Sequence, residues 1–335
     1  MVKDDVSTIM NNAIIANRNS NYKNEKELIN NLIIAINDNK DLFEKANQID
    51  LKNNNGIKLD FNIINKILDR YKDVNPLINS KDDISLLDDE LLHSKVYTKL
   101  GILLVIFDGN TYTMLELIII GLLTHNTMIF KYDGYQSGTN GLLISLVEAI
   151  LEKEKMNKYM YQETTNINID ELFKNYKTVN KVVLIGDNDF TSKYLKECPI
   201  DTIVSGYKNY DLYIDYLVDE ELARKIIKQG LNINYYINNN INVDLDNAIY
   251  VEDVEEAITY INYNGSNYSS GIMTNDNNSA AMFVNMINSK NVFVNASPTL
   301  EQSLDLEEKD LLKEKTIVMP NIYKFDGKKV NINIE

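Results

Sequence analysis

Reactive side chains are few in this 335-residue chain, which has one cysteine, Cys198, and two histidines, His93 and His125. A catalytic thiolate needs a nearby cation, a histidine or a helix N-terminus to stabilise its charge. Cys198 follows a predicted helix and stands beside Glu197, so the sequence favours an inert thiol. The histidines fall in different predicted elements, and no nucleophile elbow accompanies them. We therefore predict neither a hydrolytic triad nor a bound metal.

Glycines indicate a second kind of chemistry, the binding of phosphate. No G-x-G-x-x-G or P-loop sequence occurs. Gly134, Gly138 and Gly141 lie between a predicted strand and a predicted helix, where backbone N–H groups can face an anion. Lys131 ends the same strand and could pair with a phosphate or a ribose. An ordinary loop and a solvated lysine explain the same residues, so both interpretations stay open.

A regular alternation of strands and helices must position these residues. Five strands are predicted in residues 101–107, 127–132, 158–162, 182–185 and 202–204, with helices between them in residues 114–123, 141–155, 169–176 and 190–196. Apolar strands joined by helical crossovers predict a doubly wound parallel sheet. Ligands of such sheets bind beyond the carboxyl ends of the strands. The predicted ligand loops are residues 108–113, 131–140, 163–167 and 186–189.

Further elements flank this sheet on both sides. Apolar residues at helical spacing in residues 26–73 predict an N-terminal helical lobe, and residues 95–99 predict a strand arm. A second α/β unit is predicted after residue 211, with strands in 212–214, 248–251, 270–274 and 291–295 and helices in 219–229, 254–261 and 280–287. An Asn-rich loop is predicted between residues 229 and 248. Residues 300–315 predict a charged helix, and residues 316–334 a strand arm.

Composition limits the partners. The net charge is 34 − 49 = −15, which argues against a nucleic-acid binder. The most apolar run, residues 115–123, is far shorter than the roughly 20 residues of a membrane span. We find no secretory signal pattern at the N-terminus, and a single cysteine excludes an internal disulfide framework. A cytoplasmic protein without membrane or nucleic-acid partners is expected.

Several ordered segments resemble one family. Residues 45–71 and 99–140 are similar to the N-terminal region and the first βαβ unit of gamma-glutamyl phosphate reductase, a branch of the aldehyde dehydrogenase superfamily. YQETTNIN, residues 161–168, resembles that family's "ETTDR" turn. Residues 261–298 resemble its "NRYGSGHSEAIVTED" and "VDSAAVYVNAST" segments.

The resemblance implies an aldehyde dehydrogenase-like fold with a Rossmann-like cofactor domain, a smaller α/β catalytic-type domain and a strand arm for dimerisation. The domains would be a helical lobe and arm, 1–98, a cofactor-type domain, 99–210, a catalytic-type domain, 211–299, and an oligomerisation arm, 300–335. The family reduces gamma-glutamyl phosphate with NADPH in proline biosynthesis, through a cysteine nucleophile and an oxyanion-stabilising asparagine. NADP or NAD is therefore an expected cofactor, although the chain could also use none.

Only some of the family's site residues have a counterpart in this sequence. The family's cysteine loop "TQRPGVCNA" corresponds to GLNINYYINNNI, residues 230–241, which has no thiol, and Cys198 corresponds to a segment of the cofactor domain. The family's asparagine falls near Tyr112, or at Asn110 with a two-residue shift. Cys198 and Asn110 are thus only weak catalytic candidates. Lys131, Gly134, Gly138 and Gly186 are the candidates for cofactor binding.

The sequence supports two main functional hypotheses. The first is a catalytically degenerate homologue, a pseudoenzyme with a binding or assembly role, forming a homodimer or pairing with an active paralogue. The second is an active NAD(P)-dependent oxidoreductase acting on an acyl phosphate or aldehyde. A weaker third hypothesis is a scaffold that builds a homo-oligomer.

Overall fold

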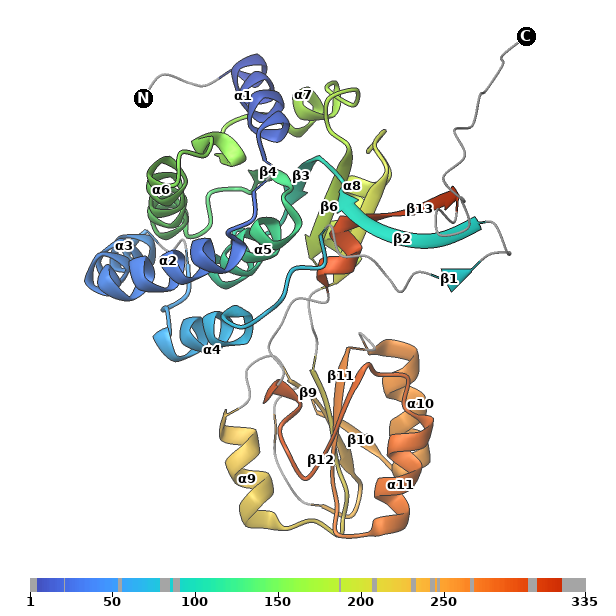
Figure 1. Ribbon diagram of the computed structural model, residues 1–335. Helices are drawn as coiled ribbons and strands as arrows, with labels where there is room; N and C mark the ends of the chain where they lie inside the picture. The colour runs from blue at the N-terminus through green and yellow to red at the C-terminus, as the bar shows by residue number, and fades with distance from the viewer. Residues whose placement is uncertain are drawn as a thin grey trace. The chain divides into compact units, whose positions relative to one another are not determined.

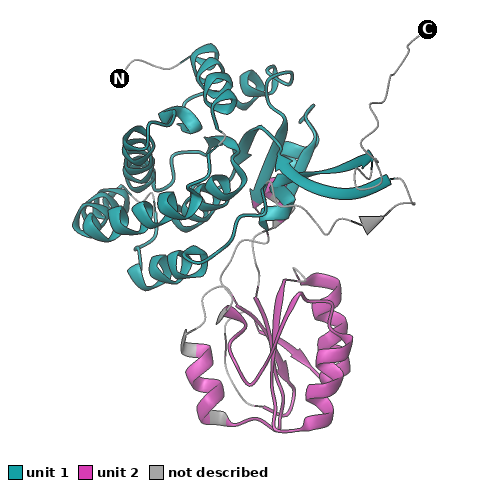
Figure 2. Cartoon of the chain, in the orientation of Figure 1, with its two compact units in different colours: residues 1–185, 192–204, 307–335 teal, residues 186–191, 205–306 magenta. Residues whose placement is uncertain are grey.

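The computed structural model describes residues 5–20, 22–53, 56–78, 85–86, 91–186, 188–206, 210–229, 233–241, 245, 248–265, 268–300 and 306–320. The chain forms two compact units (Figure 2). Unit 1 comprises Met1–Ile185, Ser192–Val204 and Glu307–Glu335, and unit 2 comprises Gly186–Thr191 and Ser205–Leu306.

The first sheet has the strand order β5-β4-β3-β6-β7. Its strands are β3 (Ile102–Ile106), β4 (Thr127–Lys131), β5 (Tyr161–Thr164), β6 (Lys181–Gly186) and β7 (Thr202–Gly206). The pairs β3–β4, β4–β5 and β3–β6 are parallel. The predicted doubly wound parallel sheet is confirmed. The strand predicted for residues 158–162 begins later, at Tyr161, because Lys158–Met160 form a 3-10 turn.

The helices around this sheet are α1 (Val6–Arg18), α2 (Glu25–Asp38), α3 (Lys40–Lys52), α4 (Phe61–Tyr71), α5 (Thr111–Thr124), α6 (Ser137–Lys153), α7 (Ile169–Phe173) and α8 (Asn188–Leu195). The helices α2 and α3 pack on α6, and α4 packs on α5, so these three form an outer layer (Figure 1). Every residue of α5 except Tyr112 is buried, so the most apolar run of the sequence is a core helix. Within the described residues, no helix has the length and hydropathy that crossing a membrane requires.

The helix α1 was not predicted, although the sequence carries its signals. Asp5 Oδ1 accepts the N–H of Thr8 at 2.7 Å, which is an N-terminal cap. Ile9, Met10 and Ala13 are buried on one face. A cap followed by apolar residues at helical spacing is sufficient for this prediction.

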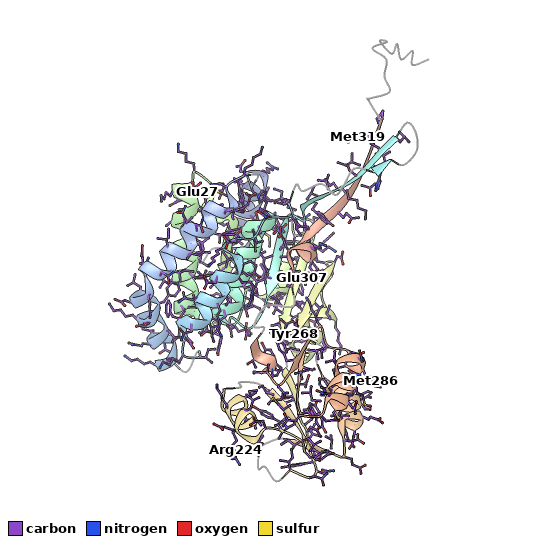
Figure 3. The ribbon with its side chains drawn as sticks, turned by 60° about the horizontal axis from the view of Figure 1, so that its bottom comes forward. Glu27, Arg224, Tyr268, Met286, Glu307 and Met319 are labelled. Carbon is purple, nitrogen blue, oxygen red and sulfur yellow. The ribbon has the colours of Figure 1, made fainter. Side chains whose placement is uncertain are left out.

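An antiparallel arm extends from unit 1. It is formed by β2 (Leu91–Lys99) and β13 (Leu312–Pro320), and the short β1 (Ser85–Leu86) pairs with β2. In Figure 3, Met319 is labelled near the C-terminal end of β13. Lys95 and Glu314 form an ion pair across the two strands at 2.8 Å. The strand predicted for residues 95–99 and the start of the C-terminal strand arm are confirmed, and residues 321–334 of that arm lie outside the described residues.

The charged helix predicted for residues 300–315 is wrong. Pro298–Leu300 and Glu308–Leu311 are short 3-10 turns, and Leu312 already begins β13. Residues 312–315 are leucine, lysine, glutamate and lysine, which all have good helix propensity, but backbone pairing with β2 decides their conformation.

Unit 2 contains the second parallel sheet, in the order β10-β9-β8-β11-β12. Its strands are β8 (Tyr210–Ile214), β9 (Ile233–Asn238), β10 (Ile249–Val251), β11 (Ser269–Met273) and β12 (Asn291–Val294). Its helices are α9 (Glu220–Gln229), α10 (Val254–Asn264) and α11 (Asn277–Met286). Figure 1 shows α9 on one face of the sheet and α10 and α11 on the other.

The side chains of β8 point alternately to the two faces of the sheet, which explains why helices pack on both faces. Leu212 and Ile214 pack in the apolar cluster that contains α9 residues, whereas Tyr213 packs in the cluster of α10 and α11. Successive side chains of a strand point to opposite faces, so one short strand contributes to both cores. The second α/β unit predicted from the sequence is confirmed.

The predicted Asn-rich loop is wrong for Ile233–Asn238, which form β9 between β8 and β10. Asparagine is depleted in strands because its amide needs partners. Here those partners come from elsewhere in the fold. Asn234 Nδ2 donates to Asp211 at 3.0 Å, and Asn238 Nδ2 donates to the carbonyl of Glu252 at 2.9 Å.

Candidate functional site

The strand order of unit 1 points to one edge of its sheet. From β3 the chain winds outward to β4 and β5, then returns to the other side of β3 to form β6 and β7. Ligands of doubly wound sheets bind beyond the carboxyl ends of the strands at such a reversal. We therefore consider the residues that follow β3, β4, β5 and β6.

Asn110 lies after β3 and begins α5. Its Oδ1 accepts the N–H of Tyr112 at 2.9 Å, so the side chain caps the helix. The next donor at this helix start, the N–H of Thr111, bonds to Gln136 Oε1 at 3.1 Å. The hydroxyl of Thr111 donates to Asn140 Oδ1 at 2.8 Å. The start of α5 is thus filled by the chain's own side chains.

Gly138 lies in the first turn of α6, the helix start for which a phosphate site and an ordinary loop were both open interpretations. Its N–H donates to Asp50 Oδ1 at 2.9 Å. The N–H and hydroxyl of Thr139 donate to Asp50 Oδ2 at 2.9 Å and 2.6 Å. Asp50 belongs to α3 and is 3% exposed. A buried carboxylate from another helix therefore occupies the anion position at the start of α6.

Lys131, at the end of β4, is buried to 8% exposure. Its Nζ donates to the carbonyl of Thr165 at 3.1 Å, to the carbonyl of Tyr132 at 3.3 Å and to Asp133 Oδ1 at 3.3 Å. The ammonium group therefore ties the end of β4 to the turn after β5. A ligand that bound this ammonium group would share it with the three oxygen atoms that it already contacts.

Gly134 and Gly186 differ in their surroundings. Gly134 has a φ of +83° and open space where a side chain would stand, so it can approach a ligand closely. Gly186 ends β6, and a Cβ atom there would clash with the ring of Phe190. Packing of the next helix therefore explains the glycine at 186. The cofactor roles of both residues stay predictions.

Glu163 is a site residue that the sequence reasoning did not single out. The phenol of Tyr132, after β4, donates to Glu163 Oε2, on β5, at 2.5 Å. Burial raises the pKa of the Glu163 carboxyl, while the bond from Tyr132 opposes that shift. A half-buried carboxyl with a raised pKa can exchange a proton or accept a hydroxyl group. Its place at the end of a predicted strand was the available signal.

Cys198 lies away from these groups along the chain, between α8 and the edge strand β7. Its N–H bonds to the carbonyl of Tyr194 in the last turn of α8. Its Sγ donates to the carbonyl of Ile200 at 3.4 Å and accepts from the hydroxyl of Thr202 at 3.5 Å. The C-terminal end of a helix carries partial negative charge, which does not stabilise a thiolate.

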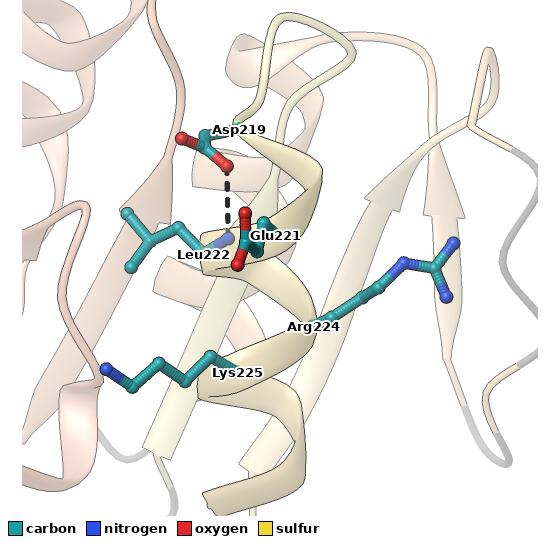
Figure 4. A pocket seen from close by; sticks show the side chains of 5 residues that line it. All are labelled: Asp219, Glu221, Leu222, Arg224 and Lys225. Carbon is teal, nitrogen blue, oxygen red and sulfur yellow. Dashed lines mark hydrogen bonds between the residues drawn. The ribbon is translucent and has the colours of Figure 1, made fainter.

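A pocket of about 580 Å³ borders α9 in unit 2. Figure 4 shows Asp219 accepting the N–H of Leu222 at the start of the helix, at 3.1 Å. Lys225 projects to one side of α9 and Arg224 to the opposite side. Glu221 also lines the pocket. These charged groups diverge, so they do not form a convergent catalytic set.

The carboxyl edge of the second sheet is built from polar side chains that satisfy one another. Asp215, just after β8, accepts the hydroxyl of Thr274 at 2.6 Å and the N–H of Tyr216 at 2.8 Å. Asn295 bonds to both the N–H and the carbonyl of Thr274. These contacts tie β8, β11 and β12 together and leave the Asp215 carboxylate 2% exposed.

The described groups of unit 1 fit only part of a nicotinamide dinucleotide. The starts of α5 and α6, as folded, do not fit a phosphate, because Asn110, Gln136 and Asp50 take their N–H groups. Lys131, Gly134 and the Tyr132–Glu163 pair are compatible with a ribose or amide group. Among the described residues, no group of three or more His, Cys, Asp and Glu side chains is placed to hold a metal ion.

Comparison with known proteins identifies the relatives. No family model matches the sequence. A gamma-glutamyl phosphate reductase from Haemophilus influenzae is 24% identical, over 76% of this chain and 78% of that protein. The crystal structure of the gamma-glutamyl phosphate reductase from Thermotoga maritima superposes with a TM-score of 0.70 and 14% identity, covering 94% of this chain and 98% of that one.

An engineered glycolyl-CoA reductase with bound NADP⁺ superposes with a TM-score of 0.72 and 12% identity, covering 94% of this chain and 96% of that one. These likenesses confirm the resemblance to gamma-glutamyl phosphate reductases and the aldehyde dehydrogenase-like α/β fold.

Proposed function

We propose that this chain, which has an aldehyde dehydrogenase-like fold and is similar to gamma-glutamyl phosphate reductases, does not perform their cysteine-dependent chemistry and acts as a binding or assembly subunit. Covalent acyl transfer by such an enzyme needs an activated thiol. The chain has one cysteine, and Cys198 is bonded to the carbonyl of Ile200 at the C-terminal end of α8. The position of this one thiol is the observation that carries the proposal.

The connection between α9 and β9 supports the same proposal. By resemblance, the family's cysteine loop corresponds to residues 230–241, which start after α9 and include all of β9. None of these residues is a cysteine. The neighbouring strand β9 contributes tyrosines and asparagines whose described side chains bond within unit 2.

The test is an assay for cysteine-dependent turnover. Purified protein is incubated with glutamate semialdehyde, phosphate and NADP⁺, and NADPH formation is followed. We expect no rate above the protein-free control, whereas a gamma-glutamyl phosphate reductase with its cysteine is the positive control. Turnover by the native chain that Cys198→Ser abolishes would refute the proposal, provided that circular dichroism shows the variant to be folded like the native chain.

A second candidate function is an NAD(P)-dependent oxidoreductase that acts on an aldehyde or acyl phosphate without a cysteine intermediate. The pairing of Tyr132 with Glu163 beside Lys131 favours it, because a carboxyl with raised pKa could carry a proton during reduction. When bound, the nicotinamide would supply the hydride. Lys131 and Glu163 would orient the ribose side of the cofactor.

Nicotinamide titration tests the second candidate. No saturable change in NADPH or NADH fluorescence up to about millimolar concentrations would contradict it, whereas a binding subunit without turnover is compatible with either result. The second predicts saturable binding that Glu163→Gln weakens. Glu27→Gln is the matched control, because Glu27 is an exposed residue on α2, outside the loops that follow the strands of the sheet.

We also propose that the chain works as a cytoplasmic homodimer or with an active paralogue. The antiparallel arm of β2 and β13 supports this, since β13 is an edge strand of its sheet and unpaired strand edges readily accept another strand. Light scattering on the 38.5 kDa chain tests it. A mass of two chains supports self-association, and a monomer that also fails to bind a coexpressed paralogue contradicts it.

A further inference from the structure

His125 ends α5 in a backbone conformation that is uncommon for residues other than glycine. Its φ is +58° and its ψ +19°, the left-handed region. Glycine or asparagine normally holds this position after a helix, because a larger side chain is strained there. The side chain of His125 is nonetheless fully buried. Strain that persists at a buried polar residue suggests that its contacts have a role.

The contacts of the imidazole reach the N-terminal lobe. Its Nε2 lies 2.7 Å from Glu25 Oε1, at the start of α2. Its ring lies 3.9 Å from the ring of Tyr22, and the phenol of Tyr22 donates to the carbonyl of Leu122 in α5. His125 therefore joins the beginning of α2 to the end of α5.

The same turn holds the base of the arm. Asn126, next to His125, donates to the carbonyl of Leu311 at 2.7 Å and accepts the N–H of Gly101 at 2.8 Å. Lys99, the last residue of β2, donates to the carbonyl of Asn17 and to the hydroxyl of Ser20, at 2.5 Å each. The end of α1, the start of α2 and the arm thus meet at one buried polar cluster.

The neutral imidazole fits this cluster better than the charged imidazolium does. Bonding to the Glu25 carboxylate requires Nε2 to carry the proton. Nδ1 is buried without a hydrogen-bond partner in the described structure. A second proton would sit on Nδ1, in a site with no acceptor for it, and would add positive charge near Lys99. At this buried position, leaving the lone pair of Nδ1 without a partner costs less free energy than leaving a charged N–H donor without an acceptor.

Other ionisable groups facing the cluster do not reverse this balance. Glu25 favours the charged imidazole, while Lys99 and burial oppose it, and burial is the largest effect. The phenol of Tyr22 stays protonated because burial raises its pKa. Burial, with a smaller contribution from the charge of Glu25, raises the pKa of Glu308, in the turn before β13.

We propose that His125 is a proton-sensitive latch, which holds the α1–α2 turn and the base of the β2–β13 arm on the core while its ring is neutral and releases them when the ring is protonated. The direction of the pH dependence follows from the difference between the pKa of His125 in the folded chain and in the unfolded chain. Burial lowers the pKa of His125 below its usual 6.5, so the stabilisation is present above about pH 6.5 and is lost as the pH falls through the pKa of the folded state.

The chain is well suited to a direct test, because it has only two histidines. Each gives one imidazole Cε1–H signal in NMR, and His93→Asn assigns them. We expect His125 to titrate below 6.5. Amide hydrogen exchange is then measured at about pH 7.5 and at about pH 5.5. The rates are converted to protection factors, which remove the intrinsic pH dependence of the exchange reaction. We expect protection in α1 and α2 to fall by several-fold, up to the limit of about tenfold that one proton with an open-state pKa near 6.5 allows, in the native chain and in His93→Asn.

His125→Asn supplies the matched variant, since asparagine tolerates the left-handed conformation but does not titrate. We expect its protection in α1 and α2 to be the same at both pH values. A pKa of His125 at or above 6.5, protection that does not change with pH in the native chain, or an equal loss in His125→Asn would each overturn the latch. If His125→Asn does not fold, the titration and exchange of the native chain and His93→Asn still decide.

Discussion

Asp50 holds Thr139 through two hydrogen bonds to one carboxylate oxygen, Oδ2, from the N–H at 2.9 Å and from the hydroxyl at 2.6 Å. The other oxygen accepts the N–H of Gly138. Asp50 thus caps α6 from α3, almost 90 residues earlier in the chain. The helical lobe is fastened to the sheet at the edge where ligands of such folds bind.

Replacing Asp50 should loosen that attachment. Asp50→Asn keeps the size of the side chain but turns one acceptor oxygen into a donor that faces other donors. We expect a loss of about 1 to 3 kcal/mol in the free energy of unfolding of unit 1. Urea unfolding followed by circular dichroism measures it. Asp69→Asn is the control, because Asp69 is exposed on α4 and pairs only with Lys72 on the surface. Equal losses in both variants would contradict the role given to Asp50.

Asp211 should make unit 2 more stable in mild acid. The carboxyl is fully buried, Oδ2 has no partner in the described structure, and burial raises the pKa to about 6 from the model-peptide 3.8. The protonated form is therefore favoured by folding. Its stabilisation is fully present below about pH 3.8 and is lost as the pH rises through about 6, by about 3 kcal/mol.

Asp211→Asn removes this titration, so we expect the variant to unfold at higher temperature than the native chain at about pH 7.5 and to lose the advantage near pH 4. Asp276 provides a control of opposite sign. Hydrogen bonds from Ser279 and Asn278 lower its pKa, so Asp276→Asn should lose stability mainly at neutral pH. The prediction would be wrong if the difference in melting temperature between the native chain and Asp211→Asn were the same at both pH values.

Two glycines at the candidate site should respond differently to alanine. Both have positive φ, +94° at Gly109 and +83° at Gly134. A Cβ atom at Gly109 would lie 2.7 Å from the Tyr132 ring and 2.7 Å from the carbonyl of Tyr135, whereas Gly134 has open space. We expect Gly134→Ala to cost about 1 to 2 kcal/mol from backbone strain alone, and Gly109→Ala about 3 kcal/mol or more. Thermal unfolding of the pair measures the difference, and equal costs would contradict it.

Cys198 should react slowly with alkylating agents. It is half-buried at the end of α8, beside Glu197, and its sulfur bonds to Ile200 and Thr202. No helix N-terminus favours the thiolate. We expect iodoacetamide to modify it no faster than free glutathione, as measured by mass spectrometry. Thr202→Val, which removes one contact, should change the rate by less than about tenfold. Alkylation much faster than glutathione would indicate an activated thiol.

Local patterns predicted most of the sheet and helix order. The apolar strands β3, β4 and β6 and the buried helix α5 follow from their composition. The errors came where partners distant in sequence decide the outcome. Asparagines predicted a loop at β9, but Asp211 and Glu252 satisfy their amides. Leu312–Lys315 form a strand because β2 pairs with them.

The sequence by itself determined the single thiol, the two histidines, the parallel α/β class and the family that the chain resembles, because residue counts, apolar runs and motif order are properties of the chain read in line. Only the tertiary structure decided that Asp50 fills the start of α6, that Tyr132 pairs with Glu163 and that His125 meets Glu25. Each of these contacts joins residues far apart in the chain, so their geometry exists only when the whole fold brings the elements together.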